Sequence, residues 1–197
     1  MIMRPWRDLI VIALFLCPVL GLNVEGEIQA AANDSAKSSA AAASGDQRAR
    51  FTGTYRYAGG TQEDDARKAA IDHAVESMSA FTRSTARNRI TATTQIRGSY
   101  AFSFEPGKIK VLPESRPEMI SGDKGEPADY VYNGKTSKLT QMIAGDRITQ
   151  VFVSDDGKRE NEFTLSKDGR TLTLKATVSS ARLSTPVVYS LSYKKAD

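Results

Sequence analysis

The chain has 197 residues, with 40% hydrophobic and 25% charged residues and a formal net charge of +4 at pH 7. So small a basic excess, without basic clusters interleaved with stacking aromatics, argues against nucleic-acid binding. The only cysteine, Cys17, lies near the N-terminus, so a chain that loses this segment has no disulfide, thiolate nucleophile or cysteine-based metal site.

Residues 1–26 have the pattern of a secretory signal peptide. Arg4 and Arg7 precede an apolar run that ends at Leu22, and this run is shorter than the ~20 residues of a spanning helix. We predict a cleaved signal and a periplasmic or secreted protein, with an uncleaved anchor as the alternative. A lipoprotein is less expected, because Leu16 stands where a small residue would precede a lipid-modified Cys17.

Residues 27–50 are rich in Ala and Ser and contain few large apolar side chains. Such a segment cannot bury enough surface to offset the entropy lost on ordering, so we predict a disordered linker. Residues 51–197 then form one domain of ordinary size with a single core.

The domain begins with a strand over 51–57, followed by one long amphipathic helix. Thr61 to Asp64 fits a helix-capping pattern, and the helix is expected to run to about Arg89. Its apolar stripe has spacings of three and four and consists of Ala70, Ile71, Ala74, Val75, Met78, Phe81 and Thr85.

Beyond Thr94 the hydrophobic period changes to two, which is typical of strands with one buried face. Asn133-Gly134, Asp156-Gly157 and Asp168-Gly169 separate these runs and are strong hairpin signals. The Pro- and Gly-rich segment 113–129 interrupts them, with one short strand expected around Met119. The sequence predicts a mainly β fold, an antiparallel meander barrel of eight to ten strands in which the first strand pairs with the last.

Phe51-Thr52-Gly53-Thr54-Tyr55 opens the first strand, and Leu191-Ser192-Tyr193 lies in the closing one. These two short motifs resemble the calycin superfamily, and the strand–helix–meander order looks more like fatty-acid-binding proteins than lipocalins. The resemblance implies a small barrel that binds a hydrophobic ligand. It also matches Leu191 and Tyr193 to the family's carboxylate-binding Arg-x-Tyr, of which only the tyrosine is present.

Alternation along the strands predicts which side chains face the interior. If Phe163 and Leu165 point inward, Arg159 and Asn161 share their face. On the preceding strand, Gln150 shares a face with Ile148 and Phe152. These groups either hydrogen-bond a polar ligand head, or Arg159 lies in solvent at the strand end and Asn161 pairs with a neighbour. The candidate ligand-binding set is Tyr55, Tyr57, Tyr100, Phe102, Gln150, Phe152, Arg159, Asn161, Tyr189 and Tyr193.

Other candidates have simpler explanations. Arg83 and Arg87 share a helix face, with Arg89 and Arg97 nearby in sequence. They either attract an anionic ligand or membrane surface, or are a solvated face beside the helix C-terminus. His73 has no set of further metal ligands at useful spacing.

The sequence therefore predicts an exported, non-catalytic protein that binds a hydrophobic or amphipathic small molecule in a β-barrel. The alternative is a cell-envelope interaction module with a filled barrel and a protein partner. No serine nucleophile elbow, phosphate-binding glycine loop or metal-ligand spacing is present. We expect no enzyme activity, cofactor, metal or nucleic-acid partner, and no membrane span in the mature chain.

Overall fold

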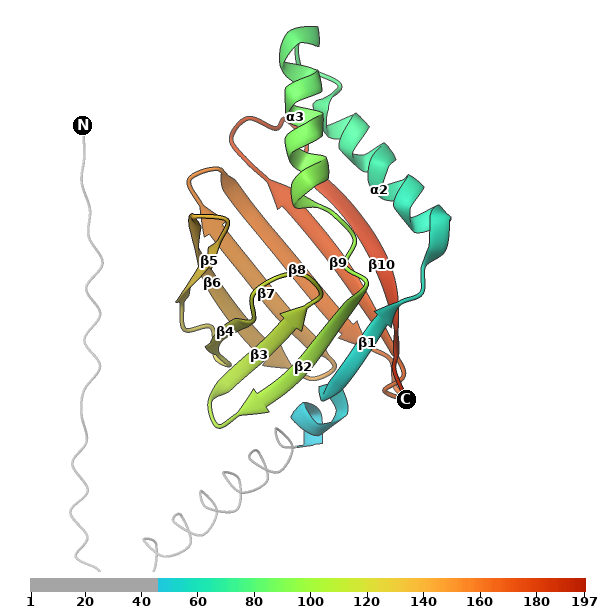
Figure 1. Ribbon diagram of the computed structural model, residues 1–197, viewed down its shortest axis with the longest axis vertical. Helices are drawn as coiled ribbons and strands as arrows, with labels where there is room; N and C mark the ends of the chain where they lie inside the picture. The colour runs from blue at the N-terminus through green and yellow to red at the C-terminus, as the bar shows by residue number, and fades with distance from the viewer. Residues whose placement is uncertain (1–45) are drawn as a thin grey trace, which may run out of the picture. The chain divides into compact units, whose positions relative to one another are not determined.

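The computed structural model describes residues 46–197, in which ten antiparallel strands form one sheet that curls into a nearly closed barrel (Figure 1). The strands are β1 Gly53–Tyr57, β2 Ser99–Glu105, β3 Lys108–Pro113, β4 Met119–Gly122, β5 Ala128–Tyr132, β6 Lys135–Ala144, β7 Arg147–Ser154, β8 Gly157–Leu165, β9 Thr171–Ser179 and β10 Val187–Lys195. Helices α2 Gly60–Val75 and α3 Ala80–Thr93 lie between β1 and β2. The predicted signal peptide and residues 27–45 of the predicted linker lie outside the described residues.

The first strand pairs with the last, which confirms the predicted barrel. In the antiparallel pair of β1 and β10, Tyr57 lies opposite Tyr193, and β1 also pairs with β2. At the other edge, the amide of Gly125 donates to the Gln141 carbonyl at 2.9 Å, so the segment after β4 reaches β6. Hydrogen bonding therefore continues nearly all the way round, and few strand edges are left unprotected.

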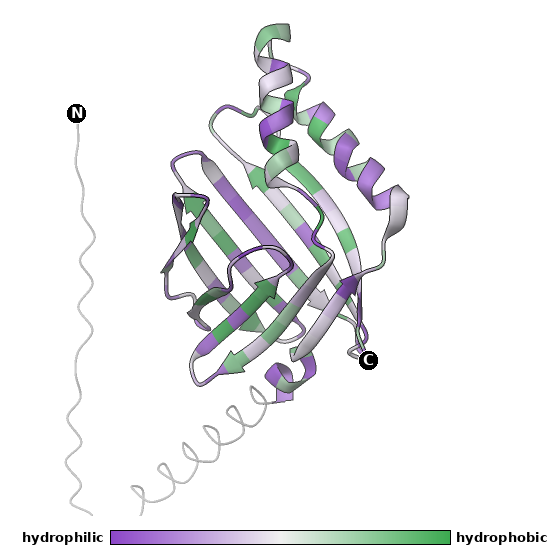
Figure 2. Ribbon diagram, in the orientation of Figure 1, coloured by the Kyte–Doolittle hydropathy of each residue, from purple (hydrophilic) through white to green (hydrophobic). Residues whose placement is uncertain are grey.

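The inner face of the sheet carries the core. Along the strands, hydrophobic and hydrophilic residues alternate, as Figure 2 shows. Six aromatic rings pack on the side of β1, β2, β8 and β10, with neighbouring centroids 5.2 to 6.5 Å apart. We call this set the aromatic cluster; it consists of Phe51, Tyr55, Tyr100, Phe102, Phe163 and Tyr193.

Two local predictions about the strands are confirmed. Asn133 and Gly134 both have positive φ, 49° and 72°, and form the turn between β5 and β6. Such a turn matches the twist of the strands it joins. The irregular segment before β5 contains the short strand expected around Met119.

The helical segment between the first two strands is confirmed, but it is divided into two helices. After Val75 the chain turns, and Ser79 begins α3 by accepting a hydrogen bond from the Thr82 amide at 3.4 Å. Arg83 donates to the carbonyls of Glu76 and Met78 at 2.8 and 2.9 Å, satisfying the end of α2.

This break corrects the predicted apolar stripe. Ile71, Ala74 and Val75 are buried as expected, whereas Phe81 is 91% exposed and Thr85 is exposed. A new helix begins with a new rotational phase, so the spacing counted through α2 does not continue into α3. The residue that α3 buries is Ile90 instead.

Residues 46–51 are helical and lead directly into the barrel. Composition assigned 46–50 to the linker, but in the structure Arg48 pairs with the buried Asp123, and Phe51 is 1% exposed. The ion pair of Arg48 with the buried Asp123 makes residues 46–50 part of the folded domain, and composition alone does not indicate such a contact. Among the described helices, none is long and apolar enough to span a membrane.

Candidate functional site

A line of polar side chains crosses the inner face of β6, β7 and β8. Gln141, Gln150 and Asn161 are between 0 and 2% exposed. Asn161 donates to the Gln150 side-chain oxygen at 3.3 Å, and Gln150 donates to that of Gln141 at 2.6 Å. We call these three residues the polar ladder. Gln141 in turn donates to the Ile109 carbonyl at 3.0 Å, so the ladder is anchored on β3.

Arg159 ends this ladder at the helix end of the barrel, which we define as the end where α3 runs into β2. Its Nε donates to the Asn161 side-chain oxygen at 2.8 Å, and its Nη1 to the carbonyl of Thr93 at 2.8 Å. The remaining Nη2 donates to the Tyr189 hydroxyl at 3.2 Å. All three acceptors are uncharged, so this partly buried cation has hydrogen bonds but no counter-ion among the described residues.

Two further arginines lie at the same end. Arg97 is in the connection from α3 to β2, and Arg116 follows β3, with its guanidinium 4.0 Å from the centre of the Tyr132 ring. Burial, followed by the nearby guanidiniums of Arg116 and Arg159, lowers the pKa of Arg97. The helix end of the barrel thus gathers positive charge over aromatic and neutral polar groups.

Tyrosine hydroxyls line the same region. Burial raises the pKa of Tyr100 and that of Tyr193, so both phenols are neutral at ordinary pH. Among the described residues, the buried hydroxyls of Tyr130 and Tyr193 have no hydrogen-bond partner, and neither has the buried Nε of Arg116. Buried polar atoms normally have partners, so these atoms mark places where a ligand or water would be accommodated.

The structure places the ten predicted site residues in three groups. Gln150, Asn161, Arg159 and Tyr189 form one hydrogen-bonded chain; alternation had placed the first three of them on the inner face. The second group belongs to the aromatic cluster and comprises Tyr55, Tyr100, Phe102 and Tyr193. The third consists of Phe152, which packs against Tyr130 at 5.6 Å between ring centroids, and Tyr57, which packs against Tyr193 at 5.7 Å and donates to the carbonyl of Gly60. Their role in ligand binding stays a prediction.

Sequence reasoning missed two members of the site. Gln141 is two residues from the buried Leu139 on the same strand, so the period-two rule could have placed its side chain inside. Arg116 had no such signal, because it lies in the irregular segment between β3 and β4.

Other charged candidates have structural partners outside this site. Arg87 forms an ion pair with Asp72 at 2.6 Å, and the side chain of His73 is 71% exposed beside Glu76. No group of three or more potential metal ligands occurs within residues 46–197. A surface hollow of about 400 Å³ lies between α2 and α3, and the same Arg87–Asp72 pair lines it.

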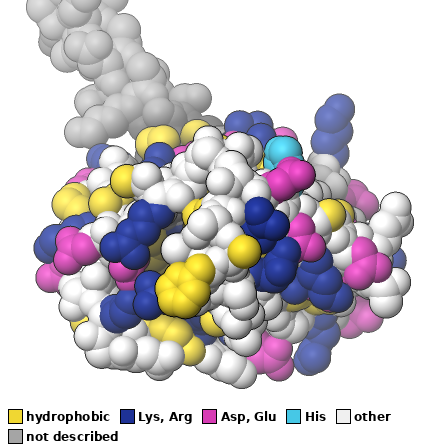
Figure 3. All heavy atoms as spheres, turned by 90° about the horizontal axis from the view of Figure 1, so that it is seen from above, with side chains coloured by type: hydrophobic (Ala, Val, Ile, Leu, Met, Phe, Trp, Pro, Cys, Tyr) yellow, Lys and Arg dark blue, Asp and Glu magenta, His cyan; other side chains and the backbone are white. Residues whose placement is uncertain are grey.

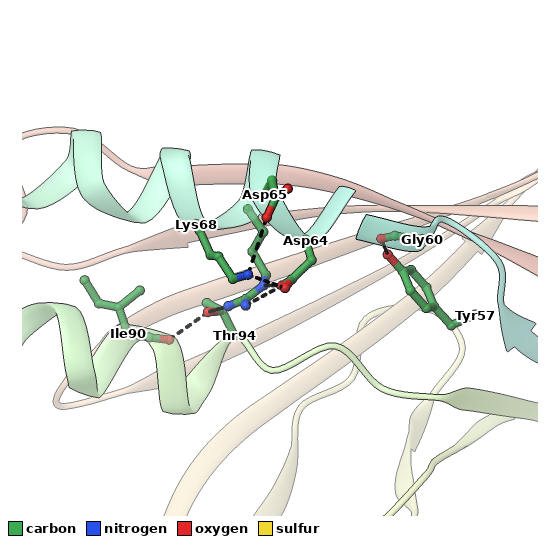
Figure 4. A network of polar contacts seen from close by, with 8 residues as sticks. Tyr57, Gly60, Asp64, Asp65, Lys68, Ile90 and Thr94 are labelled. Carbon is green, nitrogen blue, oxygen red and sulfur yellow. Dashed lines mark hydrogen bonds and ion pairs between the residues drawn. The ribbon is translucent and has the colours of Figure 1, made fainter. Parts of the chain in front are cut away.

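A buried arginine joins the two helices near the site. Arg67 donates to Asp64 at 2.6 Å and to the Thr94 hydroxyl at 3.2 Å, and Thr94 donates to the Ile90 carbonyl (Figure 4). Arg67 and Thr94 are both buried. This network holds the C-terminal end of α3 against α2, and with it the Thr93 carbonyl that Arg159 contacts.

No family model and no curated protein matches the sequence. Among solved structures, the chain is 16% identical to "REP1-NXSQ fatty acid transporter", with a TM-score of 0.47, covering 76% of this chain and 98% of that one. A Schistosoma mansoni fatty acid binding protein in complex with arachidonic acid is 18% identical, with a TM-score of 0.46 and coverage of 77% and 99%. For a fatty-acid-binding protein from Drosophila melanogaster brain the identity is 13%, the TM-score 0.46 and the coverage 74% and 99%.

At these identities and TM-scores, the ligands of the solved structures say nothing about a ligand of this chain. The fold is established by the chain's own strand order, with two helices between the first and second of ten antiparallel strands. The chain therefore has the predicted antiparallel meander barrel, with its helical segment between the first and second strands.

Proposed function

We propose that this chain is an exported, non-catalytic protein that binds an amphipathic small molecule at the helix end of its barrel. The observation that carries the proposal is Arg159, a cation partly buried beside the aromatic cluster and supported only by neutral acceptors. An acidic or strongly polar head group would lie against this guanidinium, and the apolar part against neighbouring rings.

The physical reason is the cost of an uncompensated charge. Partly burying a guanidinium without a counter-ion is unfavourable, and neutral hydrogen bonds recover only part of the lost hydration. An anionic ligand would supply the missing charge and could accept from the Arg159 fork in a bidentate geometry. The unpartnered hydroxyl of Tyr193 would offer one further donor at the same end.

A second candidate function, a cell-envelope interaction module, is favoured by a different observation. The aromatic cluster packs closely on one side of the interior, and Phe81 is 91% exposed on α3. A filled barrel would leave the outer surface for binding, and the exposed Phe81 would be one contact of a partner's interface there. Export is proposed from the signal-like residues 1–26.

Native mass spectrometry of the mature domain, purified from its own host, separates the two functions. A stoichiometric small-molecule adduct supports the binding protein. A clean apo mass, together with no change in melting temperature across a panel of alkyl acids and alkyl alcohols, would overturn it and leave the interaction module.

The role of Arg159 is tested by Arg159→Gln, which removes the charge and keeps hydrogen-bonding capacity. We expect at least about a tenfold loss of affinity for alkyl acids, or ~1.4 kcal/mol, with little change for the matching alcohols. Arg147→Gln is the control, since Arg147 is on the exposed face and pairs with Glu162 at 3.1 Å. Equal effects of the two substitutions would refute the assignment of Arg159.

A further inference from the structure

Three arginines from separate parts of the chain converge at the helix end of the barrel. Pairing of Tyr100 with Pro113 brings the start of β2, which follows Arg97, beside the end of β3, which precedes Arg116. From the opposite side, Arg159 on β8 reaches the Thr93 carbonyl, four residues before Arg97. We call Arg97, Arg116 and Arg159 the arginine triad.

Within residues 46–197, no carboxylate forms an ion pair with any member of the triad. Glu114 follows β3 in the same region, but its side chain is exposed and is not paired with these arginines. The charges of Arg116 and Arg159 both act on Arg97, and an anion bound among the three guanidiniums would relieve this repulsion. Figure 3, which views the molecule from above relative to Figure 1, shows Lys and Arg side chains interspersed with Asp and Glu side chains on that face.

The site also has more donors than acceptors. Arg116 stacks on Tyr132, and its Nε is buried without an acceptor in the described part of the chain. Tyr130 is 8% exposed and Tyr193 is 0% exposed. Their hydroxyls likewise have no hydrogen-bond partner among the described residues. Buried donors of this kind, next to uncompensated cations, indicate a ligand with several acceptor oxygens.

We propose that the arginine triad binds a dianion, a phosphate monoester at the end of an apolar chain, rather than a single carboxylate. This inference rests on the proposed function and specifies its ligand class. One carboxylate has two oxygens and one charge, which suits one guanidinium fork. A phosphate monoester carries about −1.5 to −2 charges at pH 7 and has three acceptor oxygens, which suits three guanidiniums.

The test is a calorimetric titration of the mature protein with four probes: decyl phosphate, decanoate, decanol and inorganic phosphate. We expect decyl phosphate to bind at least about tenfold more tightly than decanoate near pH 7.5. This preference should decline below about pH 6, where the phosphate becomes a monoanion. Inorganic phosphate should bind far more weakly than the decyl ester.

Substitutions of the triad arginines test whether these residues cause the preference for decyl phosphate. Arg97→Gln and Arg116→Gln should each lower decyl phosphate affinity about tenfold or more and change decanoate affinity by less than about threefold. Arg116→Lys should give an intermediate loss, because lysine keeps the charge but lacks the fork. Arg147→Gln, on the exposed face, is the matched control and should leave all four affinities unchanged.

The outcomes separate this inference from the proposed function. Equal binding of decyl phosphate and decanoate would refute the dianion and leave the binding protein intact. Binding of none of the decyl compounds would refute both, and binding of inorganic phosphate as tight as that of its ester would refute the apolar part of the ligand. If a variant fails to fold, the wild-type series still decides.

Discussion

Helices α2 and α3 follow one another in the chain but are attached to the barrel very differently. Along α2 the buried residues are Arg67, Ile71, Ala74 and Val75, whereas the only buried residue of α3 is Ile90, near its C-terminus. Figure 1 shows α2 lying along β10, while α3 rises beyond the strands. The first helix is thus a structural part of the core, and the second is held at one end.

The end of α3 that is held is also the end that meets the candidate site. Arg67 contacts Thr94 there, and Arg159 contacts Thr93. The start of α3, with the exposed Phe81, makes no comparable buried contact among the described residues. Stability should therefore depend on α2 and on the last turn of α3, and much less on the first turn of α3.

The largest effect is expected at Ile71, which is 1% exposed on α2. Ile71→Ala should lower the free energy of unfolding by about 4 kcal/mol, because a large buried side chain leaves a cavity in a packed core. Ile90→Ala on α3 is the comparison, and should cost about 2 kcal/mol. Urea denaturation measures both, and a greater loss at Ile90 would reverse the proposed difference between the helices.

The next effect concerns the link between the helices. Arg67→Met keeps much of the side-chain length but removes the hydrogen bonds to Asp64 and Thr94. We expect a loss of about 2 kcal/mol, since bonds to a charged group are involved and Thr94 is left buried without this donor. Lys68→Met is the control: Lys68 also pairs with Asp64, but it is exposed, so its loss should stay below about 0.5 kcal/mol. Similar losses would show that the buried link is unimportant.

A smaller, pH-dependent effect is expected at Asp64. Hydrogen bonds from Lys68 and then Arg67 lower the pKa of this carboxyl below its unfolded value. The resulting stability is present above the unfolded pKa of about 3.9 and is lost as the pH falls through the lower folded value. Asp64→Asn should cost less than about 1 kcal/mol at neutral pH, because the side chain is partly exposed, and should flatten the acid limb of stability against pH. An unchanged acid limb would contradict this assignment.

The smallest effect is expected at the exposed start of α3. Phe81→Asp should change the free energy of unfolding by less than about 0.5 kcal/mol, because Phe81 is 91% exposed. Ile90→Asp on the same helix is the matched control and should be severely destabilising, since it buries a carboxylate without a partner. A large loss with Phe81→Asp would mean that the start of α3 packs against something in solution.

Much of the fold follows from local patterns in the sequence. Period-two alternation identified most strands, and Asn133-Gly134 identified a hairpin because both residues adopt positive φ. The division of the helical segment was missed, since the run from Ala70 to Met78 has an unbroken helical spacing. Ser79 is a good N-cap residue, but only the structure shows it in that role.

The candidate site was predictable only where it lies on regular strands. Counting by two from Phe163 placed Asn161 and Arg159 on one face, and the structure joins them by a hydrogen bond. Arg116 could not be found in this way, because an irregular segment has no period. Its position over Tyr132 depends on how β3, β4 and β5 meet.

The amino-acid order by itself determined the strands, the turns and the inward side of each strand, because alternation and turn chemistry act between residues close in the chain. Only the tertiary structure decided which distant residues meet: Arg67 with Thr94, Arg159 with Thr93, and three arginines at one end of the barrel. When a sheet closes into a barrel, strand register and sheet curvature decide which distant residues meet. Neither register nor curvature can be read from the sequence of one segment alone.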